Sequence, residues 1–400
     1  MKINEAGKKM KIVLISDHYP AFPGQASPNI SYAIHAFARQ WARTGHVLVI
    51  RPWVLSGRKW RPPLFLKKSF VLDGVKVVLC PVVKLPFQPI FWLRGLFRII
   101  KKEIDADVVV AHLGFNLIFG YKTAKRFDLP FVAAVHDGDL LRFGPKMLTV
   151  KLMRKIYGYA AGIACRSFAL YSYFVKWAPE LSDKCFVAYS GVNADILIPR
   201  DAAMRRFKDK EKKDSIRLIS VCHLIDRKHI DVVLLALHAL GRQTDWIYEI
   251  VGKGPAESRL HQLTKSLGLC DRVHFKGYLA KQEVQNILER SQIFVMVSSN
   301  ETFGLAYLEA MAAGNIVIAG KGTGVDGIIE DGVNGFLCIP GDADDLSEKL
   351  QHICFEITTN DRLDIVKKSL ATIQEYTEEK AADNYMQILQ QAIECGGGIS

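Results

Sequence analysis

The sequence predicts an α/β protein made of two doubly wound, Rossmann-like units, and two observations carry that prediction. Short β-branched runs recur along both halves of the 400-residue chain, separated by segments of helix length. Each half opens on such a run, KIVLIS at 11–16 and IRLISV at 216–221. Because 400 residues exceed one ordinary hydrophobic core, we expect two domains.

The remaining strands are expected in chain order after each opening run. In the first half they are VLVIR, VKVVL, DVVVAH, FVAAVH and AGIACR, and in the second YEIVG, RVHFKG, IFVMVSS, NIVIAG and GFLCI. Two such units facing each other would bind ligands in a cleft at the carboxyl ends of their strands.

The charge pattern predicts where the domains divide. The dense charge run at 199–214 is expected to be a linker between domains at 1–198 and 215–375. A final helix, from about Tyr376 to Ile393, lies in the C-terminal segment 376–400 and is expected to pack back across the junction.

Composition restricts the compartment and the class of protein. The eight cysteines are scattered singly without a C-x-x-C pair, which indicates neither a zinc site nor a disulfide framework and fits a reducing compartment. The apolar run Ile12–Ile15 is too short for a signal peptide, and the uncharged stretch Val108–Tyr121 is too short to span a membrane. We expect a cytoplasmic protein, soluble or peripheral on the membrane.

Charge is distributed unevenly between the halves. Residues 1–200 hold 30 Lys and Arg against 12 Asp and Glu, a balance of +18, and the remainder holds 23 against 29, a balance of −6. The stretches 58–70 and 90–102 interleave basic and apolar residues and are candidates for docking on anionic lipid. The alternative for 90–102 is an ordinary helix packed on the sheet with a solvated basic rim. Nucleic acid is a poorer partner because no recognised binding module is present.

The stretch SSNETFGLAYLEAMAAG at 298–314 carries the clearest chemistry. Thr302 is the expected N-cap of its helix, which leaves the amides of Gly304 and Leu305 free to bind an anion such as a diphosphate. Glu301 precedes the helix, and Glu309 lies within it among apolar residues, where sugar hydroxyls would offset the cost of a buried carboxylate. The alternative is that Glu309 points to solvent or caps a neighbouring backbone group.

Together, several segments resemble the retaining glycosyltransferase family 4 (group 1 glycosyltransferases), which has the GT-B fold. ETFGLAYLEAMAAG has the family's E-x7-E spacing, and YEIVGKGPAESRL, RVHFKGYLAKQEV, EDGVNGFLCIPGDADDLSEKL and YSGVNADILIP resemble further family segments in the family's order. In the last of these, Ser190 stands where Asn is usual.

This resemblance implies a role for each matching residue in binding a nucleotide-sugar. Glu301 would contact hydroxyls of the donor sugar and Glu309 those of the ribose. The implied donor-binding positions are Phe303, Gly304 and Leu305 by the sugar and diphosphate, Val251, Gly252, Phe275 and Gly277 in the base and ribose pocket, and Thr323 and Gly324 where the family has a Gly-Gly pair.

One departure from the family lies after the first strand of the second half. The family's G-R-L-x-x-x-K-G reads Cys222-His-Leu-Ile-Asp-Arg-Lys-His229 here, so Lys228 is kept and His223 stands for the arginine. A neutral imidazole is a weaker phosphate partner than a guanidinium, although Arg227 compensates if the loop turns it inward. Three alternatives follow: a different donor, a His223 protonated by the diphosphate, or a weakened or inactive homologue.

The first half contributes fewer matching residues. Gly24 is the remaining candidate for the family's glycine-rich loop beside the donor phosphates, and His136 is implied to lie beside the reacting sugar. His112 ends its strand in the same way and is either a cleft residue or a core histidine. The D-x-D triplet Asp137-Gly138-Asp139 matches the metal signature of another glycosyltransferase fold, and we do not expect a metal there.

These features lead to one expected function and two rivals. The sequence is expected to encode a metal-independent, retaining hexosyltransferase without a cofactor, in which Glu301, His136 and Lys228 are catalytic. It would move a sugar from a UDP- or GDP-sugar to a lipid-linked or growing saccharide in cell-envelope polysaccharide synthesis. The rivals are a sugar-nucleotide epimerase or phosphorylase of the same fold, and a non-catalytic nucleotide-sugar-binding protein.

Overall fold

The computed structural model describes residues 9–25, 30–55, 69–84, 91–103, 106–136, 147–212, 215–241 and 245–396, and it divides into two compact units. Unit 1 comprises the chain up to Arg166, 170–189 and the part from Glu378 onward, and unit 2 comprises 167–169 and 190–377. The N-terminal part of unit 1 therefore runs to Tyr189, whereas the sequence places the boundary at 198.

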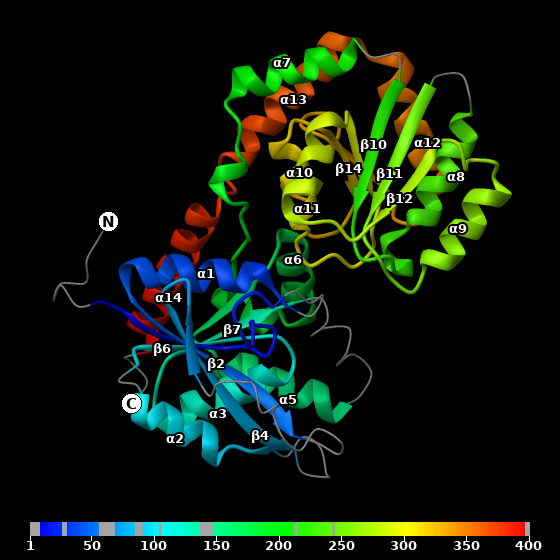
Figure 1. Ribbon diagram of the computed structural model, residues 1–400. Coiled ribbons are helices and arrows are strands. Elements are labelled where there is room, and N and C mark those ends of the chain that lie inside the picture. The colour runs from blue at the N-terminus through cyan, green and yellow to red at the C-terminus, as the bar shows by residue number, and fades with distance from the viewer. Residues whose placement is uncertain are drawn as a thin grey trace. The chain divides into compact units, whose positions relative to one another are not determined.

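Unit 1 is built on a mostly parallel sheet (Figure 1). Its strands are ordered β3-β4-β2-β1-β6-β7-β8-β9, with β5 and β3 both antiparallel to β4. Its elements are β1 (Lys11–Ile15), α1 (Tyr32–Thr44), β2 (His46–Leu55), β3 (Ser69–Leu72), β4 (Val75–Lys84), β5 (Phe91–Trp92), α2 (Arg94–Glu103), β6 (Val108–His112), α3 (Phe115–Phe127), β7 (Phe131–Val135), α5 (Met147–Tyr159), β8 (Gly162–Cys165), α6 (Phe168–Trp177), η1 (Pro179–Lys184), β9 (Cys185–Val187) and α14 (Glu378–Gly396). The six strands expected from the sequence are all present.

Both faces of the unit 1 sheet are buried, which explains why its strands are apolar throughout. Along β1, Val13 and Ile15 pack into one core with helices α2, α3, α5 and α6, whereas Ile12 and Leu14 pack into a second core on the opposite face. Because successive side chains of a strand alternate between faces, a continuous β-branched run serves both cores.

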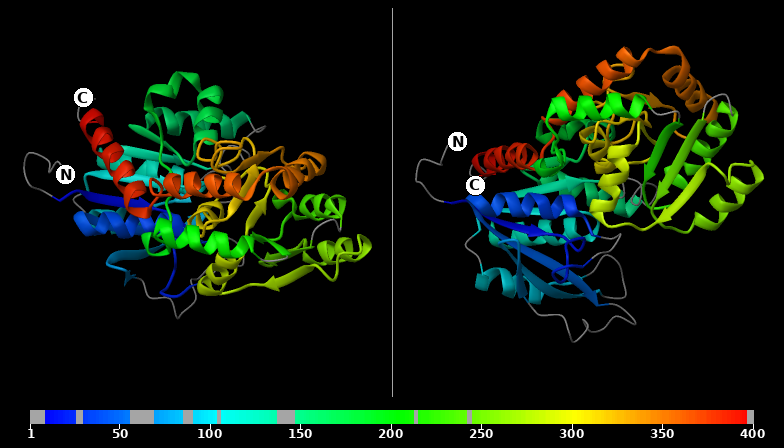
Figure 2. Two further views of the ribbon diagram at one scale, coloured as in Figure 1. Left: turned by 90° about the horizontal axis from the view of Figure 1, so that it is seen from above. Right: turned by 45° about the horizontal axis from the view of Figure 1, so that its top comes forward.

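Helix α14 closes the second of these cores. It lies beside α1 (Figures 1 and 2) and contributes Ala381, Ala382, Tyr385, Leu389 and Ala392 to the core. The indole nitrogen of Trp41 donates to the Ala382 carbonyl at 3.2 Å, and Arg39 forms an ion pair with Glu378. The C-terminal helix expected to pack back thus completes the first domain.

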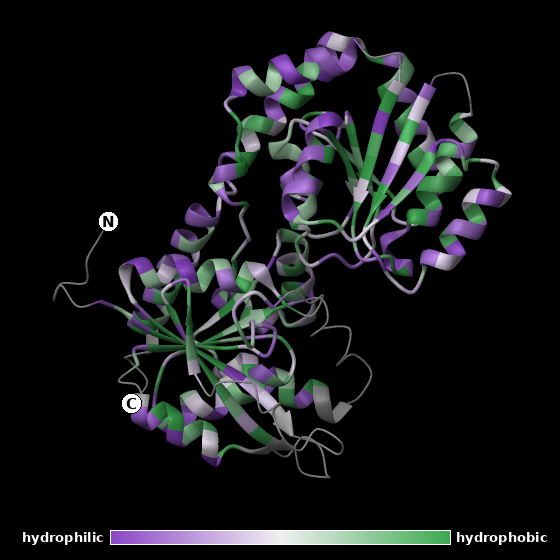
Figure 3. Ribbon diagram, in the orientation of Figure 1, coloured by the Kyte–Doolittle hydropathy of each residue, from purple (hydrophilic) through white to green (hydrophobic). Residues whose placement is uncertain are grey.

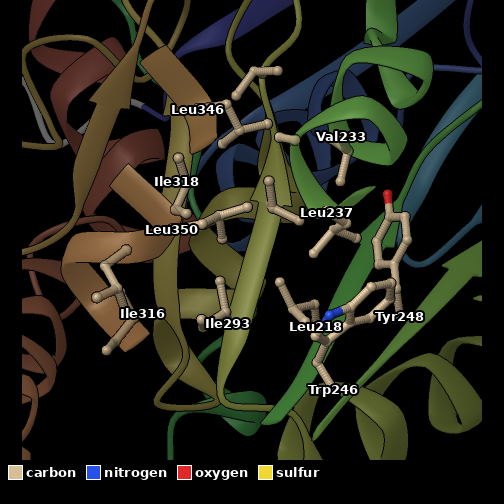
Figure 4. Packing of buried hydrophobic residues seen from close by; sticks show 14 of the residues in the cluster. Leu218, Val233, Leu237, Trp246, Tyr248, Ile293, Ile316, Ile318, Leu346 and Leu350 are labelled. Atoms are coloured by element: carbon tan, nitrogen blue, oxygen red, sulfur yellow. The ribbon is translucent and has the colours of Figure 1, made fainter. Parts of the chain in front are cut away.

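Unit 2 contains a six-stranded, fully parallel sheet ordered β12-β11-β10-β13-β14-β15. Its elements are η2 (Ala194–Ile196), α7 (Arg200–Glu211), β10 (Ser215–Val221), η3 (Asp226–Lys228), α8 (Ile230–Leu240), β11 (Asp245–Val251), α9 (Glu257–Ser266), β12 (Val273–Gly277), α10 (Lys281–Arg290), β13 (Ile293–Met296), α11 (Leu305–Ala312), β14 (Ile316–Gly320), β15 (Phe336–Cys338), α12 (Ala343–Gln351), η4 (His352–Glu356) and α13 (Thr359–Ile373). Figure 4 shows its core, where Leu218 and Ile293 of the central strands meet Leu237 of α8 and Leu350 of α12.

The charge run at 199–214 is not a simple linker. Residues 200–211 form α7, which buries Ala203 and Phe207, one helical turn apart, in the core of unit 2. Even Lys210 is buried, and its ammonium donates to the Ser291 carbonyl at 2.7 Å. Because charged residues outnumber these two buried apolar residues, the sequence pattern does not indicate a packed helix.

The amphipathic stretch at 90–102 takes the ordinary packed arrangement within the described residues. Leu93, Leu96 and Ile100 are buried in the unit 1 core, while Arg98 and Lys101 are exposed. Hydrophilic and hydrophobic colours alternate along α2 in Figure 3. Its apolar face is therefore occupied, and only the basic rim remains for an anionic surface.

The other candidate docking stretch, 58–70, lies outside the described residues except for its last two. Among the helices in the described ranges, none has the length and apolar character needed to cross a membrane.

Candidate active site

The strand order of unit 2 places its candidate site between β10 and β13. Numbered along the chain within the unit, the order is 3-2-1-4-5-6, so the connections run in opposite directions from the two central strands. In such sheets ligands bind where the connections diverge, beyond the carboxyl ends of the strands. The two loops at that point are 222–229 and 297–304, which hold the cations and carboxylate expected from the sequence.

Lys228 and Glu301 meet across this switch point. Lys228 lies in η3, and its ammonium donates to the carboxylate of Glu301 from the opposite loop. Their side chains are only 9% and 13% exposed. Nη1 of Arg227 is 3.8 Å from the same carboxylate and donates to the Asn300 carbonyl at 2.9 Å. Arg227 thus approaches the carboxylate while its side chain stays 42% exposed, and two cations face one carboxylate.

The loop that carries Glu301 is tied to the sheet by a buried hydroxyl pair. The Tyr307 hydroxyl lies 2.8 Å from Ser298 Oγ and donates to the Met296 carbonyl at 2.5 Å. Ser298 Oγ also approaches the Glu301 carboxylate at 3.5 Å. These contacts hold the end of β13 and the first turn of α11 together.

Helix α11 begins later than expected. Its first residue is Leu305, and Gly304 occupies the N-cap in a left-handed conformation at φ 86°. The predicted N-cap, Thr302, is therefore wrong, because the chain makes one further turn that only glycine adopts readily. The Tyr307 amide donates to the Gly304 carbonyl at 3.1 Å, and the amides before it precede the first intrahelical bond, so they form a potential anion site with the helix dipole.

Two glycines permit close backbone approach at the same edge. A Cβ at Gly324 would lie 2.4 Å from Phe303 Cα, so the loop after β14 rests directly on the Thr302–Phe303 backbone. A Cβ at Gly252, whose φ is +130°, would lie 1.8 Å from the Cys222 carbonyl oxygen. Gly324 and Gly252 were both expected at the donor site, and neither position has room for a side chain.

His223 is exposed at the end of β10 and is held by the neighbouring loop. Its Nδ1 donates to the Lys253 carbonyl at 2.7 Å, which leaves Nε2 as the ring nitrogen directed elsewhere. Lys253, which is not among the residues expected at the site, has its stem over Gly277, 3.2 Å from where a Cβ would stand. The signal was available, because Lys253 stands where the resembling family segment has an acidic residue.

Glu309 lies one helical turn into α11. Burial raises the pKa of its carboxyl, and Lys281 at the start of α10 only partly opposes that effect. In the described part of the chain no hydrogen bond to this carboxylate is found. Because no hydrogen bond is found, the alternative in which Glu309 caps a backbone group is not realised. A partly buried carboxylate without a donor is costly.

The expected base and ribose positions are only partly brought together. The Gly252 amide donates to the Gly277 carbonyl at 2.8 Å, and the buried Val251 is in register with Gly277. Phe275 is in register with Ile250, and its ring packs against His261 of α9 at a centroid distance of 3.9 Å and an interplanar angle of 31°.

Unit 1 has a switch point of its own between β1 and β6. Asp17 follows β1, and its carboxylate accepts a hydrogen bond from Asn116 Nδ2 at 2.7 Å, which joins it to the start of α3. Burial alone would raise the pKa of Asp17, but hydrogen bonds from His18 and Asn116 and the charge of Arg51 hold it below its usual range. Gly24 lies further along the same loop at φ +78°, with open space around it.

His136 and His112 form a buried pair at the ends of β7 and β6. His112 Nδ1 is 3.2 Å from His136 Nε2, and the two side chains are 0% and 7% exposed. The fully buried guanidinium of Arg166 donates to the Ala188 carbonyl and stacks over Phe37 at 4.6 Å. The complete burial of His112 agrees with the alternative of a core histidine, and its ring lies directly against His136.

The triplet Asp137–Asp139 lies outside the described residues. Within the described ranges, no group of three His, Cys, Asp or Glu side chains is placed to hold a metal ion.

Comparison with known proteins connects both units to one class of enzyme. Residues 202–364 match the family model "Glycosyl transferases group 1", and residues 30–196 match "Glycosyltransferase Family 4". An uncharacterized glycosyltransferase of Haemophilus influenzae is 24% identical over 328 residues, 80% of this chain and 88% of the relative. The lipopolysaccharide core biosynthesis glycosyltransferase LpsE of Rhizobium meliloti is 27% identical over 190 residues, 48% of this chain and 54% of the relative.

Solved structures show the fold. Anabaena HepE in complex with UDP and glucose superposes with a TM-score of 0.70 at 19% identity, covering 95% of this chain and 99% of that one. The structural neighbours of this chain are GT-B glycosyltransferases, and the two largely parallel sheets described above agree with that architecture. This chain has the GT-B fold, and its two halves match the family models of group 1 and family 4 glycosyltransferases.

Proposed function

We propose that the protein is a retaining, metal-independent hexosyltransferase that moves a sugar from a UDP- or GDP-sugar to a saccharide acceptor. The observation that carries the proposal is the Lys228–Glu301 pair, with Arg227 beside it, at the switch point of unit 2. This arrangement offers two cations for a diphosphate and one carboxylate for sugar hydroxyls at the place where open α/β sheets bind ligands.

The donor would be bound along the edge of this sheet. Lys228 and Arg227 would neutralise the diphosphate, together with the amides at the start of α11. Glu301 would accept hydrogen bonds from the sugar hydroxyls. Glu309, which has no donor to its carboxylate among the described residues, would accept from the ribose diol, and Val251, Gly252 and Gly277 would border the base.

Catalysis would rest on stabilising the leaving group. As the bond from the anomeric carbon to the phosphate oxygen lengthens, negative charge develops on the diphosphate, where Lys228 and the helix dipole are already directed. Front-side attack would retain the configuration, with the leaving phosphate helping to deprotonate the acceptor hydroxyl. His136 is proposed to lie beside the reacting sugar, and no resident cofactor is required.

For the acceptor we propose a lipid-linked or growing saccharide of the cell envelope. LpsE, a relative over 54% of its own length, is named for lipopolysaccharide core biosynthesis. The +18 balance of residues 1–200 and the exposed basic rim of α2 favour a cytoplasmic protein that docks peripherally on an anionic membrane. The occupied apolar face of α2 makes this docking electrostatic, so it should weaken with salt.

Donor hydrolysis tests the enzymatic proposal. Purified protein is incubated with a panel of UDP- and GDP-sugars, and released nucleotide is measured for the wild type, Glu301→Gln, Lys228→Met and the exposed control Glu348→Gln. We expect slow release from one donor, lost in the first two variants and kept in the control. Release from no donor, or release unaffected by Glu301→Gln, would refute the proposal.

A second candidate is a non-catalytic nucleotide-sugar-binding protein, favoured by the replacement of a phosphate-binding arginine by His223. Calorimetric binding of UDP or GDP without release of sugar, with or without added membrane lipid acceptors, would establish that alternative. Product analysis distinguishes the epimerase alternative, because an epimerase returns a nucleotide-sugar with one inverted centre.

A further inference from the structure

The buried histidine pair of unit 1 is extended by a hydroxyl from the C-terminal helix. Tyr385 of α14 places its Oη 3.3 Å from His112 Nε2, and His112 Nδ1 lies 3.2 Å from His136 Nε2. Tyr385 and His112 are completely buried. The three side chains therefore form one continuous hydrogen-bonded chain, from a helix near the C-terminus to the histidine at the end of β7.

The tyrosine ring is fixed in place by its neighbours. Phe37 and Trp41 of α1 contact it edge-on at centroid distances of 5.3 and 5.1 Å. One turn before, the Trp41 indole holds the Ala382 carbonyl of the same helix. A hydroxyl on a ring packed in this way keeps one position relative to His112.

His112 and His136 are both neutral. Burial lowers the pKa of His112 well below its usual value, and the charge of Arg166 lowers it further. Burial does the same for His136, with additional lowering by His112, Arg166 and His18. A neutral imidazole has one N–H donor and one acceptor nitrogen, so fixing the donor at either ring fixes the tautomer of the other.

The direction of the chain is set at Tyr385. Burial raises the pKa of its hydroxyl, so the proton stays on oxygen and must be donated. His112 Nε2 is the partner of this hydroxyl that the described residues provide. A buried O–H without an acceptor is unfavourable, so Tyr385 donates to Nε2 and the His112 proton is on Nδ1. His112 in turn donates to His136 Nε2.

We infer that Tyr385, acting through His112, holds His136 in the Nδ1–H tautomer, so that His136 is a neutral hydrogen-bond donor and not a general base. Tyr385 and His112 are positioning residues in this scheme. That the acceptor of the Nδ1–H bond is an oxygen of the donor sugar rests on the proposed function. The tautomer itself is a property of the ligand-free protein.

Long-range ¹H–¹⁵N NMR of the full-length protein with ¹⁵N-labelled histidine tests the tautomer directly, with signals assigned by His112→Gln and His136→Gln. At neutral pH we expect both rings as Nδ1–H imidazoles. In Tyr385→Phe, which removes one hydroxyl, we expect the Nε2–H form to appear at both rings. Tyr121→Phe, a loss of one hydroxyl elsewhere in unit 1, should change neither.

An Nε2–H or doubly protonated His136 in the wild type would overturn the inference, and this spectrum decides it even if Tyr385→Phe does not fold. Unchanged tautomers in a folded Tyr385→Phe would overturn the role of the tyrosine. In the enzyme assay, that variant should lose roughly tenfold in kcat, as when an outer partner of a functional histidine is removed, with little change in donor KM. If no donor is turned over, the proposed function fails while the NMR result still stands.

Discussion

Lys228 donates a hydrogen bond to Glu301 although 73 positions separate them in the sequence. The contact is made by two side chains of the protein that are nearly buried. It also joins the loops that follow the two central strands of unit 2. Its energetic weight can be measured separately from catalysis.

A double-mutant cycle of Lys228→Met and Glu301→Gln should show a coupling free energy of unfolding of about 0.5–3 kcal/mol, because both side chains are nearly buried and in contact. Chemical denaturation followed by a unit 2 probe gives the four values. The exposed pair Lys368–Asp364 on α13 is the control, with an expected coupling of about 0.3–0.5 kcal/mol. Equal coupling in the two cycles would contradict a pre-organised site.

Gly324→Ala should weaken donor binding by more than its loss of folding stability accounts for. The added Cβ would meet Phe303 Cα at 2.4 Å, so the loop after β14 must separate from the loop that begins α11. Titration with UDP should show a loss of affinity of at least tenfold, about 1.4 kcal/mol. Gly332→Ala is the control within unit 2: a Cβ there meets nothing within 4 Å, so the positive φ of 75° is its only strain, and it should bind UDP normally.

His223→Arg should tighten nucleotide diphosphate binding. The exposed position can accept a permanent, bidentate cation, and exposed ion pairs contribute about 0.2–1 kcal/mol, up to roughly fivefold in affinity. His238→Arg is the control, since His238 is also exposed and its Nδ1 also donates to a carbonyl, that of Leu267 at 3.1 Å. Weaker binding by the His223 variant would indicate that the imidazole is adapted to a different donor group.

Glu309→Gln should stabilise unit 2 and weaken nucleotide binding. Because burial raises the pKa of Glu309, the folded state holds its proton more tightly than the unfolded state. The free energy of unfolding therefore falls as pH rises from the ordinary glutamate pKa to the raised one, and at neutral pH the ionised carboxylate carries the full penalty. Glutamine removes the charge and so removes this dependence.

The measurement for Glu309 is thermal unfolding from pH 4 to 8, with and without UDP. The variant should have the higher Tm at pH 7 without ligand, but a smaller shift with UDP. We expect a loss of about tenfold or more in affinity, since hydrogen bonds to charged groups contribute about 1.5–3 kcal/mol. Glu348→Gln should change neither quantity, and a Glu309 variant that is less stable at pH 7 would disprove the argument.

Leu389→Ala in α14 should destabilise unit 1 by about 2–5 kcal/mol, because the side chain is fully buried in the second core of the unit 1 sheet. Hydrogen exchange should accelerate in β1 and β6 and stay unchanged in β10 and β13. Leu346→Ala, an equally buried residue of unit 2, should give the opposite pattern. Acceleration in both units from either variant would show that they unfold as one.

The strands were predictable from sequence because a doubly covered parallel sheet needs continuous β-branched runs, and such runs are distinctive. Helix α7 was missed because two apolar anchors, Ala203 and Phe207, are outnumbered by charges that remain in water. The edge strands β3, β5 and β9 are short and carry a weak signal.

Of the candidate site, the meeting of Lys228 and Glu301 agrees with their expected place at one sheet edge, and their roles toward a ligand stay predictions. The start of α11 was misplaced by two residues, since capping patterns do not show that Gly304 continues the turn. The Tyr385–His112–His136 chain could not be foreseen, because its members come from sequence regions whose proximity only the tertiary fold creates.

The membership of α14 in unit 1 has a consequence for biosynthesis. Unit 2 is an insertion within unit 1, whose sheet is covered on one face by α1 alone until residues 381–392 are available. On the ribosome, unit 2 can therefore fold before unit 1 is complete. Until then the N-terminal half exposes part of the apolar face of its sheet, which chaperones would recognise. A nonsense codon shortly after Thr377 would spare the domain just translated and disable the one made first.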